Sequence, residues 1–157
     1  PIGELNAGLI VKKGNPFNIK TIEDCINDDS VRLVLANPEA ASIGKFTKNV
    51  LLQSQLWDKV ARKVTVMKPT VNDVANTIKI DAADVGIAWD VISHQYDDLD
   101  FVELEEFNDK SKTVTLGLLV SSLNKKRSMD FVNYMISIDK GQKTLKDFGY
   151  KLIDEKG

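Results

Sequence analysis

The chain has 157 residues, of which 43% are hydrophobic and 28% charged, and its formal net charge is −2. This length allows one domain with its own core or two small lobes. The mixed charges offer no basic face for nucleic acid, and no apolar run reaches the ~20 residues of a membrane-spanning helix. The single cysteine, Cys25, has no partner for an internal disulfide, and we expect it to be a packing residue.

The first third of the chain alternates strand and helix patterns. Residues 5–12 are predicted to form a strand that ends at a Gly-Asn-Pro turn. A short amphipathic helix is expected within residues 19–28, with Thr21 as N-cap and Asp24 three residues later. Residues 31–37 are almost wholly apolar, which is typical of a parallel strand covered on both faces.

The alternation continues through the middle of the chain. Apolar residues at helical spacing predict a helix over residues 43–57, and a strand is expected at 63–68. A second helix is predicted over residues 70–80, where Thr70 and Asp73 fit a capping box with Asp in place of Glu or Gln.

The last part of the chain is predicted to hold three strands and two helices. The strands are expected at 84–90, 101–107 and 113–122, and residues 125–146 read as two helices that are broken near residues 139–141. The order of elements predicts an α/β fold with a mostly parallel sheet flanked by helices.

Two strand-to-helix turns stand out within this pattern: ANPEAAS before IGKF, and MKPT before VNDV. Both are rich in small, proline or hydroxyl residues, and both lead directly into a helix. In parallel sheets such turns meet at the carboxyl ends of the strands, where ligands bind. Free N–H groups at two helix N-termini would suit an anion held by backbone amides.

Other chemical motifs are weak. The pair Gly44-Lys45 is not a phosphate-binding loop, since the first glycine of that motif would fall at Glu39 and Phe46 replaces its Ser or Thr. The single histidine, His94, has no second histidine nearby, so we expect no metal site. No nucleophile signature is present, and we therefore expect no enzyme and no cofactor.

Four stretches in order resemble the substrate-binding proteins of ABC importers, of the molybdate/tungstate-binding type. The resemblance covers nearly the whole chain. The four stretches are GLIVKKGNPFNIKTIEDC, VRLVLANPEAASIGKFTKNVL, KPTVNDVANTIKIDAADVGIAWDVI and FVNYMISIDKGQKTLKDFGY.

The resemblance implies the type II periplasmic-binding-protein fold, with two lobes joined by hinge strands. Family members begin with roughly 80–90 residues of first lobe that this chain lacks, a length within the usual domain range. Residues 1–12 would be a hinge strand from the first lobe, 13–113 the second lobe, and 114–157 the return strand and C-terminal helices of the first lobe. Binding would close the lobes about hinge strands near Val11 and Gly117.

The resemblance also implies a ligand site. In the family an oxyanion lies in the interlobe cleft and is held by neutral donors. By position, one backbone amide falls on Ile43 and another on Val71, while Trp89 stands where the family often has a tyrosine hydroxyl. The expected ligand-binding residues are Ser42, Ile43, Gly44, Thr70, Val71 and Trp89.

Which anion the site accepts depends on whether that anion carries a proton. Molybdate, tungstate and sulfate carry no proton at neutral pH, so a site made only of donors accepts them, whereas hydrogen phosphate needs an acceptor. Asp73 and Asp90 are the nearby carboxylates, and we expect them to cap a helix and a loop respectively. If either points into the cleft, phosphate or another protonated ligand is favoured.

The function implied is delivery of an oxyanion to the membrane permease of an ABC importer. The protein would act as a monomer in the periplasm or outside the cell, with a lipid anchor as one means of attachment, and without nucleic acid. Two alternatives stay open: a binding protein for another small anion or organic ligand, such as phosphate or sulfate, and the effector-sensing domain of a transcriptional regulator. An enzyme on the same fold would need a nucleophile or an acid/base pair at the cleft, for which the sequence offers only Asp73 and Asp90.

Overall fold

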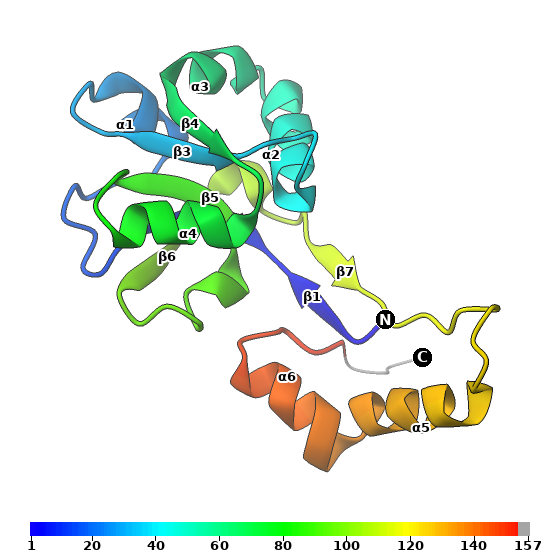
Figure 1. The fold of residues 1–157 in the computed structure, drawn as a ribbon. Helices are drawn as coiled ribbons and strands as arrows, with labels where there is room; N and C mark the ends of the chain where they lie inside the picture. The colour runs from blue at the N-terminus through cyan, green and yellow to red at the C-terminus, as the bar shows by residue number, and fades with distance from the viewer. Residues whose placement is uncertain (154–157) are drawn as a thin grey trace. The chain divides into compact units, whose positions relative to one another are not determined.

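The computed structural model describes residues 1–153, and these form two compact units (Figure 1). The larger unit is Asn6–Lys110. The smaller unit joins Pro1–Leu5 to the segment that begins at Ser111. The chain therefore passes between units at residues 5–6 and 110–111, whereas the sequence predicted these crossings at 12–13 and 113–114. Val11, expected near a hinge, is instead 1% exposed within the larger unit.

A five-stranded sheet forms the centre of the larger unit, with the order β4-β3-β5-β2-β6. The strands are β2 (Ala7–Lys12), β3 (Leu33–Ala36), β4 (Val64–Lys68), β5 (Val85–Trp89) and β6 (Leu99–Glu103). The ladders β3–β4 and β3–β5 are parallel. Strand β2, which lies between β5 and β6, is antiparallel to both of these neighbours. Four strands therefore run in one direction, which confirms the mostly parallel α/β prediction, and β2 runs against them.

The helices cover both faces of this sheet (Figure 1). They are α1 (Ile22–Asn27), α2 (Ser42–Gln53), α3 (Trp57–Lys63) and α4 (Val71–Lys79). From β3, the connection through α2 and α3 leads outward to the neighbouring edge strand β4. From β4, the connection through α4 leads back past β3 to β5, in the opposite direction along the sheet. Right-handed crossovers of opposite direction place their helices on opposite faces, so β3 and β5 are buried on both sides.

One helix prediction needs correction, and one helix was not predicted. The helix expected over residues 43–57 is interrupted, because Gln55 adopts a positive φ of 59° and a new helix, α3, begins at Trp57. The sequence pattern did not predict α3. The short helix α1 has the expected capping box, since Thr21 and Asp24 bond to each other's backbone amides. Cys25 on this helix is buried, as expected of a packing residue, and burial raises the pKa of its thiol to about 12.

The strand expected at residues 101–107 is also shifted. The observed strand β6 begins at Leu99 and ends at Glu103, and a 3-10 turn (Glu105–Phe107) follows it. Leu104 and Phe107, three residues apart, are both buried, whereas a continuous strand would place them on opposite faces of the sheet.

The smaller unit contains a two-stranded ribbon and the C-terminal helices. Strand β1 (Gly3–Leu5) pairs antiparallel with β7 (Lys112–Val114), and the helices are α5 (Lys125–Ile136) and α6 (Lys143–Asp147). A π-helical turn at Ile138–Gln142 makes the break that the sequence predicted near residue 140.

The strand predicted over residues 113–122 is much shorter than expected, since β7 ends at Val114. Residues 115–120 are apolar in pattern, yet no described strand pairs with them, and Leu119 and Val120 are 72% and 90% exposed. A strand needs a ladder partner as well as a suitable pattern. Among the described residues of this unit, no apolar side chain is buried, so the unit has no core of its own.

An ion pair joins the starts of β3 and β5. It lies at the amino-terminal ends of these parallel strands, opposite the end at which α2 and α4 begin. The carboxylate of Asp84 accepts hydrogen bonds from the backbone N–H of Arg32 at 2.8 Å and from its guanidinium at 2.8 and 2.9 Å. These bonds from the Arg32 side chain hold the pKa of Asp84 below its ordinary value of 3.8.

We expect Asp84→Asn to lower the melting temperature at pH 7 and to have a vanishing effect in acid. A carboxyl whose pKa is depressed by folding stabilises the fold above its unfolded pKa, and this stabilisation is lost as the pH falls through the folded pKa. Melting curves of parent and variant between pH 7 and pH 2 test this, with the exposed Asp109→Asn as control. A melting difference that stays constant down to pH 2 would contradict the assignment.

Candidate functional site

The N-termini of α2 and α4 meet in one depression of about 210 Å³ on the larger unit. Because β3 and β4 are adjacent and parallel, the two turns that follow them lie side by side at the carboxyl ends of the strands. The carboxyl end of β5, at Trp89, forms the remaining side of the depression. The lining residues are Ala40, Ala41, Ser42, Ile43, Pro69, Thr70, Val71 and Trp89, and none of them carries a charge.

Helix α2 begins without a side-chain cap. Its N-cap residue is Ala41, which has no side-chain acceptor to offer. The first intrahelical bond at this end runs from the Lys45 N–H to the Ala41 carbonyl. The amides of Ser42, Ile43 and Gly44 therefore lack an intrahelical acceptor, as at every helix start, and no side chain replaces it.

Gly44 holds this helix start close to the sheet. A Cβ atom built on Gly44 would lie 2.4 Å from the carbonyl oxygen of Ala36 and 2.7 Å from the carbonyl of Asn37. Any larger residue would push the first turn of α2 away from the end of β3. Gly44 is buried and is not among the residues that line the depression, so its place is behind the site.

Helix α4 begins with a partial cap. The Thr70 hydroxyl accepts from the Asp73 N–H at 3.1 Å and donates to the Asp73 carboxylate at 2.6 Å. This arrangement satisfies the third helical amide. The amides of Val71 and Asn72 stay without a side-chain acceptor, and they carry the positive end of the α4 dipole.

The two carboxylates nearest the site are both engaged. Asp73 is held by Thr70, as described, and Asp90 accepts from the Asn6 side-chain amide at 2.9 Å and from the Val91 N–H at 3.0 Å. Neither lines the depression. The helix-capping and loop-capping roles that the sequence predicted for Asp73 and Asp90 are therefore observed.

Trp89 forms the third side of the depression at the end of β5. It is 6% exposed, and the Phe46 ring from α2 lies against it with centroids 5.3 Å apart. The sequence placed Trp89 in the site only through a family resemblance, because a buried aromatic at a strand end is more often part of a core.

The structure thus brings together Ser42, Ile43, Thr70, Val71 and Trp89, while Gly44 lies behind them. Three lining residues were not singled out from the sequence: Ala40, Ala41 and Pro69. They lie within the two turns that the sequence did point to. The absence of a capping side chain at Ala41 was the signal that could have identified it.

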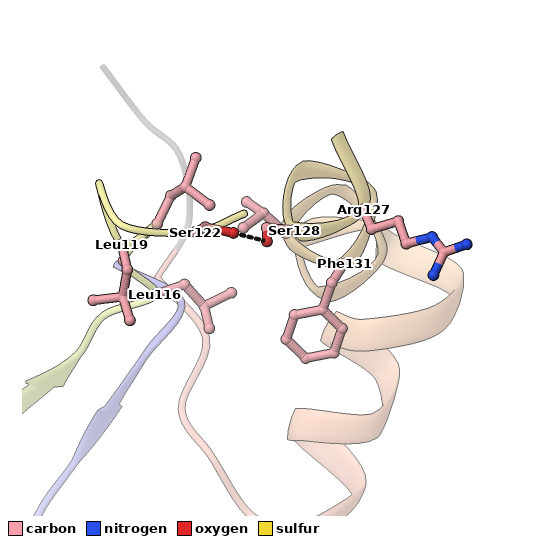
Figure 2. A pocket seen from close by; sticks show the side chains of 9 residues that line it. Leu116, Leu119, Ser122, Arg127, Ser128 and Phe131 are labelled. Carbon is pink, nitrogen blue, oxygen red and sulfur yellow. Dashed lines mark hydrogen bonds between the residues drawn. The ribbon is translucent and has the colours of Figure 1, made fainter. Parts of the chain in front are cut away.

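A second hollow, of about 460 Å³, lies on the smaller unit (Figure 2). It is lined by Leu116, Leu119, Phe131 and neighbouring residues. The Ser122 and Ser128 hydroxyl oxygens are 2.9 Å apart, and Figure 2 marks this hydrogen bond with a dashed line. It contains none of the predicted site residues. Among residues 1–153, no three His, Cys, Asp or Glu side chains cluster as metal ligands would, and no described helix is long and apolar enough to cross a membrane.

Comparison with known proteins defines the class. Residues 1–151 match the family of bacterial extracellular solute-binding proteins, and the chain belongs to this family. A Bacillus subtilis protein, provisionally named the ABC transporter substrate-binding lipoprotein YvgL, is 24% identical over 143 residues. This alignment covers 90% of the chain and 54% of YvgL, so the chain spans about half the length of its relative.

Solved structures share the fold. A substrate-binding domain provisionally assigned to a molybdenum ABC transporter of Clostridium difficile matches 97% of the chain and 65% of its own, with a TM-score of 0.69 and 22% identity. The sulfate-binding protein SubI of Mycobacterium tuberculosis matches 99% of the chain and 58% of its own, with a TM-score of 0.77 and 14% identity. A periplasmic thiamin-binding protein reaches 0.71 at 12% identity, so the fold alone does not select the ligand.

Proposed function

We propose that this chain is part of the solute-binding component of an ABC importer, and that it holds a tetrahedral oxyanion dianion at the N-termini of α2 and α4. One observation carries the proposal: two helix starts with uncapped amides face one small depression that no charged side chain enters. The ligand-binding residues of the proposal are Ser42, Ile43, Thr70, Val71 and Trp89, with Gly44 holding the α2 start in place.

Neutral donors are sufficient for such a ligand. A dianion removed from water is costly unless its oxygens are fully hydrogen-bonded, and aligned amides at the positive ends of two helices supply such bonds. The depression of about 210 Å³ is also smaller than the ~300–1,000 Å³ typical of pockets for drug-sized ligands. Both features favour a small anion over an organic ligand.

The same donors favour an anion without a proton. A protonated oxygen needs an acceptor, and the two nearby carboxylates, Asp73 and Asp90, are already bonded within the protein. Molybdate, tungstate and sulfate therefore suit the site better than hydrogen phosphate. One structural relative is provisionally assigned to a molybdenum transporter and another is a sulfate-binding protein. Our proposal favours molybdate or tungstate on the sequence resemblance.

The proposal includes the setting in which the protein works. The larger unit would be the second lobe of a two-lobe protein, and the smaller unit would belong to the first lobe, which supplies the remaining donors. The loaded protein would act as a non-enzymatic monomer outside the cytoplasmic membrane and deliver the anion to a membrane permease. Family membership supports this setting.

Calorimetric titration of the full-length protein with molybdate, tungstate, sulfate and phosphate at pH 8 tests the proposal. We expect submicromolar binding of molybdate and tungstate, weaker binding of sulfate, and no binding of phosphate. The chain of 157 residues should bind weakly or not at all, because it holds only part of the donors. Phosphate binding in preference to the other three anions, or no heat with any of them, would contradict the proposal.

A further inference from the structure

One residue, Asn37, accepts the backbone hydrogen bonds of the turn before α2. Asn37 directly follows β3, and its side-chain oxygen accepts from the Glu39 N–H at 2.9 Å. Its carbonyl oxygen accepts from the amides of Ala40 and Ala41 at 3.0 and 2.9 Å. Pro38 has no N–H to donate. Each backbone N–H that follows Asn37 in this turn is therefore bonded to Asn37 itself.

These bonds determine which amides are left for a ligand. Ala40 and Ala41 line the depression, but their N–H groups already have Asn37 as acceptor. Ser42 and Ile43 come next in the chain, and their amides have no acceptor within residues 1–153. The free donors of this turn therefore begin at Ser42, and Ala40 and Ala41 form only the wall of the depression.

The backbone of Asn37 also contacts both halves of the proposed site. Its N–H donates to the carbonyl of Lys68 at 2.7 Å, and Lys68 ends β4 two residues before Thr70, the N-cap of α4. Its carbonyl group lies against the start of α2, since a Cβ atom built on Gly44 would lie 2.7 Å from the Asn37 carbonyl carbon and oxygen. The conformation of Asn37 thus affects how the two helix starts are placed relative to each other.

The side chain of Asn37 fixes this conformation. Its bond to the N–H two residues later is an Asx turn, which an asparagine or aspartate side chain can make and an alanine cannot. Asn37 is half-buried and does not line the depression. A substitution at this position therefore removes a bond of the turn without removing a donor to the ligand.

We propose that Asn37 is a positioning residue for oxyanion binding, whose side-chain oxygen closes the turn before α2 and so holds the free amides of Ser42 and Ile43 in place for the ligand. This inference rests on the proposed function. The alternative is that Asn37 only stabilises the fold. In that case its replacement lowers the melting temperature and leaves the affinity of the folded protein unchanged.

Asn15 provides a matched control in the same unit. Its side-chain oxygen accepts from the Ile19 N–H at 3.0 Å, and its side-chain amide donates to the Ile19 carbonyl at 2.8 Å. Asn15 is half-buried, like Asn37, but it follows the end of β2 that pairs with the start of β5. It therefore closes a turn at the opposite end of the sheet from the depression.

The experiment uses the full-length protein with molybdate as probe. Dissociation constants and melting temperatures are measured for the parent, Asn37→Ala, Asn37→Asp and Asn15→Ala. We expect Asn37→Ala to weaken binding about three- to tenfold, the range for one ordinary hydrogen bond. Asn37→Asp keeps the acceptor oxygen and should restore most of this affinity, and fully so at high ionic strength, which screens the added charge. Asn15→Ala should lower the melting temperature at least as much as Asn37→Ala and leave the dissociation constant unchanged.

Amide resonances recorded at saturating molybdate report on the donors directly. In the parent, the N–H signals of Ser42 and Ile43 should shift on binding by more than those of Ala40 and Ala41. The shifts at Ser42 and Ile43 should be smaller in Asn37→Ala and return in Asn37→Asp. A purely stabilising role of Asn37 predicts the same shifts in all three proteins.

The outcomes separate this inference from the function on which it rests. A parent protein that binds no molybdate overturns the proposed ligand and this role with it. A parent that binds molybdate, together with an equal dissociation constant for Asn37→Ala, overturns the positioning role alone. The positioning role is also overturned if Asn15→Ala loses as much affinity as Asn37→Ala, or if Asn37→Asp binds no better than Asn37→Ala at high ionic strength.

Discussion

Ala41→Asp is expected to stabilise the fold and to weaken oxyanion binding strongly. Ala41 occupies the N-cap position of α2 with extended backbone angles (φ −127°, ψ 139°), the conformation in which an aspartate side chain caps a helix. The new cap should stabilise the fold by about 0.5–2 kcal/mol. The same carboxylate would occupy the amides proposed for the ligand and would repel it, so binding should fall about 100-fold or more. Thermal unfolding and calorimetric titration measure the two effects.

Ala41→Asn is the matched control for this prediction. An asparagine caps the same amides about as well as an aspartate but carries no charge. We expect a similar gain in melting temperature with a smaller loss of affinity, and the difference between the variants then measures the repulsion. If Ala41→Asp binds molybdate as tightly as the parent, the α2 N-terminus is not part of the anion site.

Gly44→Ala is expected to destabilise the protein and to weaken binding together. Helix propensity alone predicts the opposite sign, because alanine favours a helix by about 1 kcal/mol over glycine. The new Cβ, however, would lie 2.4 Å from the Ala36 carbonyl oxygen, where real Cβ atoms do not approach within 3.0 Å. The start of α2 has to move, at a cost of about 1–3 kcal/mol for overpacking. Each charge-assisted hydrogen bond lost to the anion should weaken binding by about tenfold or more.

Asn49→Ala is the control on the same helix. Asn49 is exposed on α2, so its replacement changes propensity without a steric conflict. It should leave affinity unchanged and the melting temperature equal or slightly raised. If Gly44→Ala leaves affinity and melting temperature as Asn49→Ala does, then α2 can accept a Cβ atom at residue 44 without moving away from β3.

The amino-acid sequence by itself determined the features that depend on near neighbours along the chain. Helical spacing and capping patterns located α1 and α4 with their threonine caps, and apolar runs located β2, β3, β4 and β5. The two turns that line the depression were also visible, because small residues between a strand and a helix form a local pattern. Hydrogen bonds and side-chain contacts between residues three or four apart require particular residue types at that spacing, so they can be predicted from the sequence.

Other features depended on residues that are distant in sequence. The antiparallel direction of β2 follows from its ladders with β5 and β6, and residues 115–120 form no strand because no described strand pairs with them. The sequence predicted that the turns before α2 and α4 meet at the carboxyl ends of the strands, and the family resemblance placed Trp89 beside them. The contact of Trp89 with Phe46 and the place of Gly44 against β3 are seen only in the structure. These arrangements are made by contacts between distant segments, which local patterns do not record, and so only the tertiary structure decided how the strands pair and which side chains pack around the predicted site.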